Sequence, residues 1–465
     1  MPLVEALLEW ERAGGTSFHT PGHRQGRELS HRVAALLPQR LFTLDATEVP
    51  GLDDLHDPRG AIAQAQRLLA QEYGADESFF LVGGSTAGIL AAVLAAGGPG
   101  QKLLMARYSH RAAFAAAILA GCKVRYLPER WGGDGLPRGP CPQETAEAVR
   151  KWRPAALLLT RPNYHGIAFP LQGVVHACRE VGTVLVVDEA HGAHWQAAGL
   201  PCALEAGADI VVQSAHKTLP ALTQAAWLHR RGGRVDAARL RDALRMVQSS
   251  SPSYLLMASL DAARWHLGRW RAEARGRLEG LHRLRERLEE AGIPLLPRGL
   301  PPGWVHDPLR LVVDAGAMGW SGPALAASLR EAGIEAEWAE PHRVLLLLGL
   351  TSGPEEEHLV QVLLQIARGA GEVPGGADRG GYPRLEKVMD PAGAWWAARE
   401  LIPLEGAAGR IAADLLWFSP PGVPVVVPGE RWTHEAVTFL RRCEEVGVVP
   451  VGWTEPARVR VVRRG

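Results

Sequence analysis

The amino-acid sequence predicts an α/β fold, with a mainly parallel sheet in a large domain and a smaller α/β region nearer the C-terminus. Three observations predict it. Short β-rich runs alternate with helix-like segments between about residues 76 and 230, which is the pattern of βαβ units. Runs such as Val184-Leu-Val-Val187 are apolar throughout, as expected for strands covered on both faces. A shorter alternation of the same kind follows between about residues 309 and 367.

The first alternation predicts strands that are joined by alanine-rich helices. The strands are expected at residues 102–106, 124–127, 155–160, 184–187, 210–213 and 225–229. The clearest helices are expected at residues 86–96 and 111–120, and Gly121 is a typical residue at which a helix ends.

The rest of the chain predicts one or two long helices and then a second α/β region. Residues 255–291 are rich in Leu, Ala, Arg and Glu, with few helix breakers. Strands are expected at residues 309–313 and 344–348, and helices at residues 323–331 and 355–367. A glycine-rich stretch then interrupts both periodicities, as is typical of a linker. The expected division is an N-terminal arm at 1–45, a large domain at 46–275, a small α/β domain at 276–367, a flexible linker at 368–383 and a C-terminal domain at 384–465.

Composition excludes several classes of protein. The 465 residues are 47% hydrophobic and 22% charged, which excludes intrinsic disorder. Lys+Arg total 51 and Asp+Glu total 50, so the net charge of +1 favours neither nucleic acid nor an anionic membrane as a partner. Five scattered cysteines indicate no disulfide framework or zinc knuckle, and no signal peptide or membrane span is expected. These features favour the cytoplasm.

Lysine is rare enough in this chain for each lysine to be considered singly. Only five basic residues are lysines: Lys102, Lys123, Lys151, Lys217 and Lys387. Arginine cannot replace lysine as an amine nucleophile. Lys217 follows a predicted buried strand, where side chains reach the carboxyl end of a parallel sheet and ligands collect. Desolvation there could keep the amine partly neutral, so that it forms a Schiff base with an aldehyde. The alternative is a surface lysine in a loop.

Asp188 ends another predicted strand, upstream of Lys217. If the two side chains share one site, Asp188 can hold a proton on a pyridine nitrogen while Lys217 holds the aldehyde carbon of pyridoxal phosphate. The alternative is a helix cap or a structural ion pair. Asp188-Glu-Ala-His191 also matches a helicase Walker-B box, but no lysine follows a glycine, so the phosphate loop of such NTPases is absent.

Leu81-Val-Gly-Gly-Ser-Thr-Ala-Gly88 precedes a predicted helix and could hold a monophosphate through backbone N–H groups and hydroxyls. The alternative is a tight turn with a helix cap. Ser214 and Thr218, beside Lys217, favour the phosphate interpretation. Histidines are frequent near these motifs, but no second cluster supplies thiolates, and no metal is expected.

Together these residues carry a resemblance to a known family. Nine motifs occur in order: Thr20-Pro-Gly-His23, Gly51-Leu-Asp-Asp-Leu-His56, Gly84-Ser-Thr86, Arg107-Tyr-Ser-His110, Pro162-Asn-Tyr-His-Gly166, Asp188-Glu-Ala-His-Gly-Ala-His194, Gln213-Ser-Ala-His-Lys217, Ser251-Pro-Ser-Tyr254 and Pro420-Pro-Gly-Val-Pro424. With them the chain closely resembles the Orn/Lys/Arg decarboxylases, in the short form without an N-terminal wing domain. The resemblance covers most of residues 16–265 and returns at about 405–430.

The resemblance implies the fold of pyridoxal-phosphate-dependent transferases, similar to aspartate aminotransferase. It makes Lys217 the Schiff-base lysine, Asp188 the partner of the pyridine nitrogen and His110 the residue stacked on the ring. With His216, these form the expected catalytic set. The other expected cofactor-binding residues are Ser85, Thr86, Ala190, His191 and Ser214. The chain departs from the family pattern at Tyr108-Ser109, Arg111-Ala112, Ala215 and Ser419.

The implied activity is decarboxylation of a basic amino acid in polyamine metabolism, with arginine favoured over lysine or ornithine and agmatine as the product. A homodimer or higher homo-oligomer is implied as well. The substrate's distal cation needs a carboxylate, for which Glu430, Asp53 and Asp54 are candidates, unless they are exposed or capping groups. An aminotransferase or aldolase of the same fold, or an inactive regulatory homologue, are the alternatives.

Overall fold

The computed structural model describes residues 1–369, 381–445, 448–453, 455 and 457–464. The chain divides into two compact units, each made of two segments. The first comprises Met1–Ala96 and Val184–Ala272, and the second comprises Gly97–Thr183 and Glu273–Gly465. Residues 370–380, most of the expected linker, lie outside the described residues.

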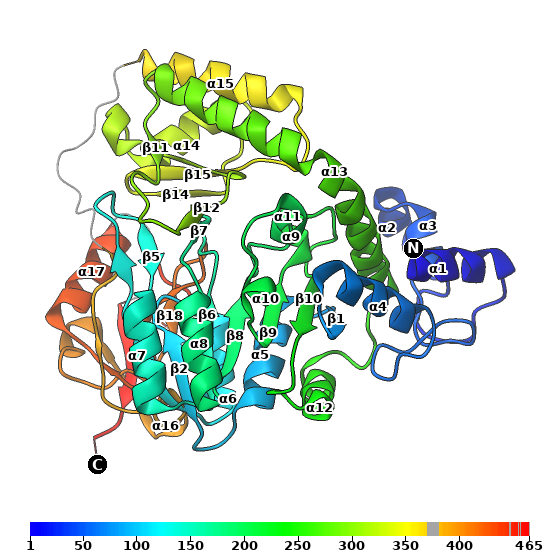
Figure 1. The fold of residues 1–465 in the computed structure, drawn as a ribbon, viewed down its shortest axis with the longest axis horizontal. Coiled ribbons are helices and arrows are strands. Elements are labelled where there is room, and N and C mark those ends of the chain that lie inside the picture. The colour runs from blue at the N-terminus through cyan, green and yellow to red at the C-terminus, as the bar shows by residue number, and fades with distance from the viewer. Residues whose placement is uncertain (370–380, 446–447, 454, 456, 465) are drawn as a thin grey trace. The chain divides into compact units, whose positions relative to one another are not determined.

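The sheet strands of the first unit are β1 (Glu77–Leu81), β10 (Ala226–Arg230), β9 (Ile210–Gln213) and β8 (Val184–Asp188), side by side in that order (Figure 1). β8 and β9 are parallel, whereas β10 is antiparallel to both β9 and β1. All residues of β8 and β9 are buried, which explains why their sequences do not alternate between apolar and polar residues.

Helices of the first unit include two that carry predicted site residues, α5 and α11. The helices are α1 (Pro2–Ala13), α2 (His31–Leu36), α3 (Gln39–Leu44), α4 (Ala61–Tyr73), α5 (Gly84–Ala96), α9 (Trp195–Ala198), α10 (Ala203–Ala206), α11 (Ala215–Thr218) and α12 (Ala237–Val247). Gly88 allows α5 to approach the sheet closely, because an added Cβ would lie 2.6 Å from Leu81 Cδ1 and 2.7 Å from Val212 Cγ1. This contact places the first turn of α5 next to the ends of β1 and β9.

The second unit contains three parallel strands with β2 (Lys102–Ala106) between β3 (Lys123–Leu127) and β6 (Ala156–Thr160). Its helices here are α6 (Arg111–Leu119), α7 (Pro142–Trp152) and α8 (Gln172–Val181), and its short strands are β4 (Arg130–Trp131), β5 (Pro137–Gly139) and β7 (Ile167–Ala168). α6 starts shortly after the carboxyl end of β2, so the segment between them, which contains His110, lies where ligands collect in parallel sheets.

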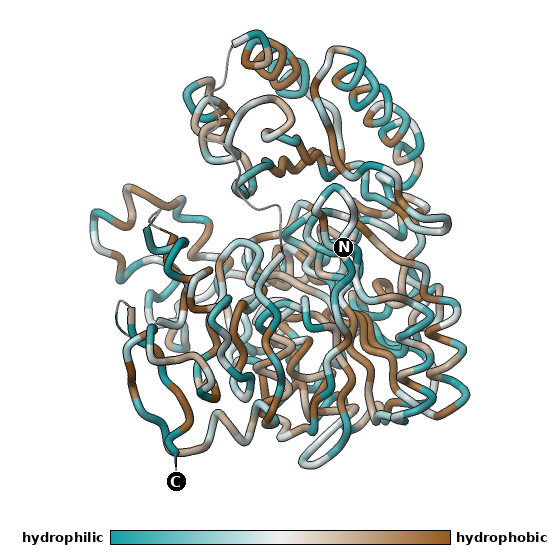
Figure 2. The backbone as a smooth tube through the Cα atoms, turned by 90° about the vertical axis from the view of Figure 1, so that its left-hand side faces the viewer, coloured by the Kyte–Doolittle hydropathy of each residue, from teal (hydrophilic) through white to brown (hydrophobic). Residues whose placement is uncertain are grey.

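An antiparallel sheet follows in the same unit, with the strand order β11 (Leu295–Leu296), β13 (Arg310–Val313), β15 (Arg343–Leu347) and β14 (Trp338–Glu340). Helices α14 (Gly322–Glu331) and α15 (Pro354–Ala367) pack on it through a core that includes Leu311, Val344 and Leu363. In Figure 2 the helices of this region alternate between hydrophilic and hydrophobic colours, as expected for helices that cover one face of a sheet. The 3₁₀ helix η1 (Gly316–Met318) and the strand β12 (Val305–His306), which pairs with β7, complete the region.

The C-terminal region of the second unit has its own core, which includes Val425, Trp432 and Leu440. Its elements are β16 (Glu386–Lys387), α16 (Pro391–Trp396), β17 (Arg399–Pro403), η2 (Leu404–Gly406), β18 (Leu416–Trp417), β19 (Pro424–Val426), β20 (Glu430–Arg431), α17 (His434–Glu445) and β21 (Arg458–Val462). β16 pairs with β20, and β17 pairs with β21.

The structure confirms the expected strands and helices to within two residues at each end. Residues 255–291, for which one or two helices were possible, form the single helix α13 (Tyr254–Glu290). The strand expected at residues 225–229 is present as β10 but runs antiparallel to its neighbours. No described helix combines the length and the apolar character that crossing a membrane requires.

Candidate functional site

Lys217 lies in α11, directly after the buried strand β9, and its amine faces the motif that follows β8. Lys217 Nζ lies 3.1 Å from His191 Nε2. His191 is buried, and Lys217 is half-buried. A charged ammonium can only donate, so His191 Nε2 is the acceptor in that state. The fold therefore places a histidine next to the predicted nucleophile, where it can accept a proton from the amine.

Asp188 is the last residue of β8, and its carboxylate is buried. Its Oδ1 accepts a hydrogen bond of 3.1 Å from the backbone N–H of Ala190. Burial raises the pKa of Asp188 above its usual range, while the positive charge of Lys217 and the Ala190 N–H offset part of this effect. A protonated ring nitrogen next to this carboxylate would stabilise its charged form.

Hydroxyl groups gather between the first turn of α5 and the segment that holds Lys217. Ser214 Oγ donates to Ser85 Oγ over 2.9 Å, and Thr86 follows in the same turn. Thr218 Oγ1 is buried and has no hydrogen-bond partner within the part of the chain that the structure describes. Helix N-termini and hydroxyls are the groups that bind phosphate monoesters. This polar set, with an orphaned buried hydroxyl, fits the phosphate of pyridoxal phosphate.

His216 and Ala190 occupy fixed positions beside these groups. His216 Nδ1 lies 2.9 Å from the carbonyl oxygen of Ala225, so Nδ1 carries the hydrogen and donates it. Burial lowers the pKa of His216, and the charge of Lys217 lowers it further, against the opposing effect of the Ala225 carbonyl. Ala190 is buried and follows Asp188 by two residues. The first unit thus brings together every predicted cofactor residue except His110.

His110 lies in the second unit, where it caps α6. Its Nδ1 accepts a hydrogen bond of 3.2 Å from the Ala112 N–H. Gly422, from the predicted Pro-Pro-Gly motif, packs against the ring: a Cβ added at Gly422 would lie 2.7 Å from both His110 Cδ2 and Nε2. The Arg111 N–H also donates to the Gly422 carbonyl over 2.8 Å. Two sequence motifs, separated by about 300 residues, therefore orient one imidazole.

Glu430 is fully buried, and its carboxylate is bound to Arg107. Arg107 Nε donates to Oε1 over 2.7 Å, and Nη2 donates to Oε2 over 3.0 Å. The Val427 N–H also donates to Oε2, over 3.0 Å. Arg107 further donates to the carbonyl groups of Pro424 and Val425. The role of Glu430 in binding a substrate cation stays a prediction, and the contacts show that it anchors the segment before His110.

Asp53 and Asp54 differ in how many hydrogen bonds each carboxylate accepts from the protein. Asp53 accepts hydrogen bonds from four backbone N–H groups at the start of α4, those of Arg59, Gly60, Ile62 and Ala63. Asp54 Oδ1 accepts one local bond of 2.8 Å, from the His56 N–H. Asp54 is half-buried.

Two of the predicted motifs meet at this loop. The Tyr254 hydroxyl donates to the Asp53 carbonyl, and His56 Nε2 lies 2.7 Å from the Ser249 carbonyl. The segment containing Asp54 is therefore tied to the start of α13.

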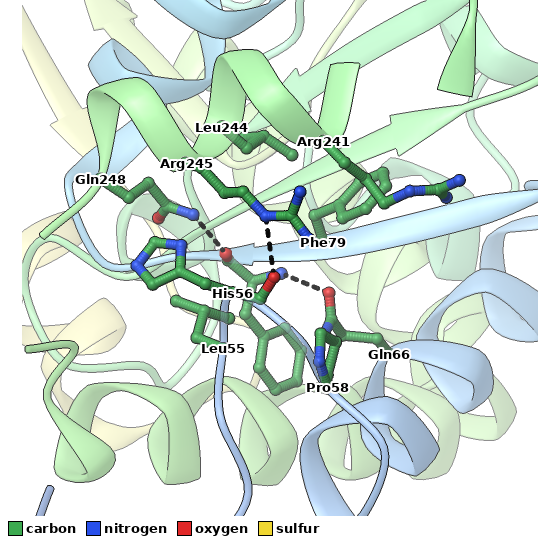
Figure 3. Close-up of a pocket in the computed structure, with 10 residues that line it drawn as sticks. Leu55, His56, Pro58, Gln66, Phe79, Arg241, Leu244, Arg245 and Gln248 are labelled. Atoms are coloured by element: carbon green, nitrogen blue, oxygen red, sulfur yellow. Dashed lines mark hydrogen bonds between the residues drawn. The ribbon is translucent and has the colours of Figure 1, made fainter. Parts of the chain in front are cut away.

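A pocket that Leu55, His56 and Pro58 of this segment help to line contains none of the predicted site residues (Figure 3). Its wall supports β1, because the Gln248 side chain accepts from the Val82 N–H over 2.9 Å and donates to the Phe80 carbonyl over 3.4 Å. Gln66 accepts from the Phe80 N–H over 3.3 Å. These contacts hold the end of β1 where the chain turns into the first turn of α5. Gln248 was not predicted, and no sequence motif marks it.

Histidine and carboxylate side chains do not form a metal site in the described part of the structure. No group of three or more His, Cys, Asp or Glu side chains is arranged there to bind a metal ion.

Comparison with known proteins gives consistent matches along the chain. Residues 1–290 match a family model described as the major domain of Orn/Lys/Arg decarboxylases, and residues 384–451 match the model of their C-terminal domain. Arginine decarboxylase of Bacillus subtilis is 32% identical over 482 residues, covering 99% of this chain and 97% of the relative. B. subtilis YaaO is 36% identical over 454 residues, covering 95% and 94%. The solved structure of the constitutive lysine decarboxylase of Escherichia coli superimposes with a TM-score of 0.83 at 19% identity, over 99% of this chain and 82% of that one, which supports the fold.

Proposed function

The chain belongs to the Orn/Lys/Arg decarboxylase family, and on that premise we propose that it converts arginine to agmatine and CO2. It is a pyridoxal-phosphate-dependent decarboxylase of a basic amino acid. The observation that carries the proposal is the placement of Lys217 and Asp188 in one unit, with the amine at His191 and the carboxylate buried.

The chemistry divides between the cofactor and the protein. When bound, pyridoxal phosphate supplies an electron sink for the pair of electrons that the departing CO2 leaves behind. Lys217 provides the amine that binds the aldehyde carbon, and Asp188 holds a proton on the ring nitrogen. His191 can accept the proton that Lys217 releases, because the two nitrogen atoms are 3.1 Å apart. Ser85, Thr86, Ser214 and His216 are the proposed phosphate ligands.

His110 is the proposed stacking residue for the cofactor ring. Its Nδ1 is occupied by the Ala112 N–H, and one edge of the ring contacts Gly422. These contacts restrict rotation of the imidazole, so the ring face is presented in one orientation. A fixed ring face is what stacking on a planar cofactor requires.

The preference for arginine is supported by the relatives. Several arginine decarboxylases match at 31–32% identity over 93–99% of this chain. The lysine decarboxylases of Pseudomonas aeruginosa and E. coli match at 24%, as does the biodegradative arginine decarboxylase of E. coli over 56% of this chain. Of the three candidate carboxylates, the contacts favour Asp54, since Glu430 is bound to Arg107 and Asp53 caps α4. A guanidinium can bind one carboxylate through two parallel hydrogen bonds.

The decisive experiment is to incubate the purified protein and pyridoxal phosphate separately with arginine, lysine and ornithine, and to identify the amine and CO2 produced. We expect agmatine from arginine at the highest rate. Faster release of cadaverine or putrescine would overturn the substrate assignment. An aminotransferase would require a keto acid and release no CO2, and an inactive homologue would show no cofactor absorbance.

We propose further that the product serves polyamine synthesis and that the protein acts in the cytoplasm as a homodimer or larger homo-oligomer. The family resemblance supports the pathway and the oligomer, and the five scattered cysteines, which indicate no disulfide framework, support the cytoplasm. Light scattering of the holoenzyme tests the oligomer, and a mass equal to one chain would contradict it.

A further inference from the structure

A chain of four buried polar side chains crosses the sheet of the first unit, next to Asp188. Ser78 on β1, His229 on β10, Gln213 on β9 and Glu189 after β8 are each at most 4% exposed. Ser78 Oγ lies 2.7 Å from His229 Nδ1, and His229 Nε2 lies 3.1 Å from Gln213 Oε1. Gln213 Nε2 donates to Glu189 Oε2 over 2.8 Å. None of these groups is part of the cofactor set proposed above.

The donor and acceptor properties of these side chains allow only one direction for the hydrogen bonds between them. The carboxylate of Glu189 can only accept, so the Gln213 amide nitrogen faces it and the amide oxygen faces His229. His229 must then donate from Nε2, which leaves Nδ1 to accept from the Ser78 hydroxyl. Burial lowers the pKa of His229 to about 3, so its ring stays neutral and keeps this tautomer. Tyr73 stacks on the ring at 4.3 Å and fixes its plane.

Glu189, at the end of this row of hydrogen-bonded side chains, is also held by backbone groups. Its second oxygen, Oε1, accepts from the Ala203 N–H over 2.9 Å, and its own N–H donates to the Val212 carbonyl over 2.9 Å. Asp188 is the preceding residue and the last residue of β8, so one peptide bond joins it to Glu189. The three hydrogen bonds that hold Glu189 therefore limit the positions that the backbone of Asp188 can take.

We propose that Ser78, His229, Gln213 and Glu189 form a positioning network that sets the Asp188 carboxylate against the ring nitrogen of the cofactor. The inference rests on the proposed function, because it assumes that Asp188 contacts this nitrogen. The four residues are positioning residues, since they act through Asp188 without contact with the reacting atoms. Leaving a buried hydrogen-bonding group unpaired is costly, so loss of one link shifts the next.

The test measures how well the protein distinguishes a ring nitrogen from a ring carbon. Cofactor-free protein is titrated with pyridoxal phosphate and with its 1-deaza analogue, which has carbon in place of the ring nitrogen, and both dissociation constants are measured by absorbance. The wild type is expected to prefer pyridoxal phosphate. His229→Phe keeps a ring stacked on Tyr73 but removes both hydrogen bonds, so this preference is expected to fall about tenfold. His229→Gln keeps a donor and an acceptor, and most of the preference should return.

Two further variants make the test specific. Tyr73→Phe removes the 2.5 Å hydrogen bond from the Tyr73 hydroxyl to the Ala193 carbonyl but leaves the network intact, so it should lower thermal stability and keep the wild-type preference. Ser78→Ala removes one hydroxyl at the far end and covers the case in which His229→Phe does not fold. We expect a smaller fall, of about threefold, in the same preference.

An unchanged preference in His229→Phe, or in Ser78→Ala where the first variant does not fold, would overturn the network, whatever happens to stability. The proposed function fails separately. If the wild type prefers pyridoxal phosphate and His229→Phe loses this preference, but no basic amino acid releases CO2, the activity is refuted and the network is supported. A wild type with no preference for the ring nitrogen overturns the network itself.

Discussion

Arg107 and Glu430 form an ion pair with two hydrogen bonds, in which the Glu430 side chain is fully buried and the Arg107 side chain is 21% exposed. The pair joins the end of β2 to β20 and so connects the C-terminal region to the segment that leads to His110. Glu430 raises the pKa of Arg107 against the opposing effect of burial, so the guanidinium stays charged. The ion pair indicates that Glu430 stabilises the fold. Its removal should therefore lower stability, whereas a substrate-binding role would raise KM.

Glu430→Gln is expected to lower the free energy of unfolding by about 3 kcal/mol, because it leaves the charge of Arg107 without its partner. Denaturant titration of the cofactor-free protein measures this change. The sequence-based alternative, that Glu430 binds the substrate cation, predicts a raised KM for arginine at normal stability, and that result would contradict the structural role.

Lys217→Ala is expected to abolish both turnover and the visible absorbance of the bound cofactor, since none of the remaining lysines replaces its amine. Lys151→Ala is the matched control, because Lys151 is exposed on α7. An unchanged absorbance spectrum of the Lys217 variant would show that another group binds the aldehyde.

Asp188→Asn should still bind cofactor through the phosphate ligands, but kcat should fall by about 100-fold or more, because a neutral amide does not stabilise a protonated ring nitrogen. Steady-state kinetics at saturating pyridoxal phosphate measure the effect. Near-normal kcat would mean that another acid faces the nitrogen.

Asp54→Asn and Asp53→Asn should have different effects. Loss of the Asp54 charge is expected to raise KM for arginine about tenfold with little change in melting temperature. Loss of the Asp53 charge weakens the cap of α4 and is expected to cost about 1 kcal/mol of stability. If Asp54→Asn leaves KM unchanged, the recognition carboxylate lies elsewhere.

The pH dependence of stability should reveal the neutral state of His229. Its folded pKa of about 3 lies below the ordinary value of 6.5, so the unfolded chain binds a proton that the folded protein excludes. The free energy of unfolding contributed by His229 is therefore complete above pH 6.5 and decreases by about 1.4 kcal/mol per pH unit as the pH falls towards 3. His229→Phe should show a shallower decrease over this range in denaturant titrations, and an identical slope would contradict the assignment.

The sequence by itself determined the fold class and the family, and it identified the candidate cofactor residues. Uninterrupted apolar runs in the sequence indicate buried parallel strands, as in β8 and β9. The family motifs contain Lys217, Asp188 and His110. Local signals suffice here because strand formation and helix capping depend on neighbouring residues. The same signals could not show that β10 runs antiparallel, since strand direction depends on pairing with distant segments.

Only the tertiary structure decided which side chains already have hydrogen-bond or ion-pair partners within the protein. Asp53, Asp54 and Glu430 look equivalent as carboxylates in a sequence, yet one caps a helix, one forms a local turn and one is bound to Arg107. Gln213 and His229 are polar residues within apolar strands, a signal that could have drawn attention, but their order in a hydrogen-bonded chain exists only once four strands lie side by side. Whether a polar group is available for chemistry depends on the partners that folding brings to it.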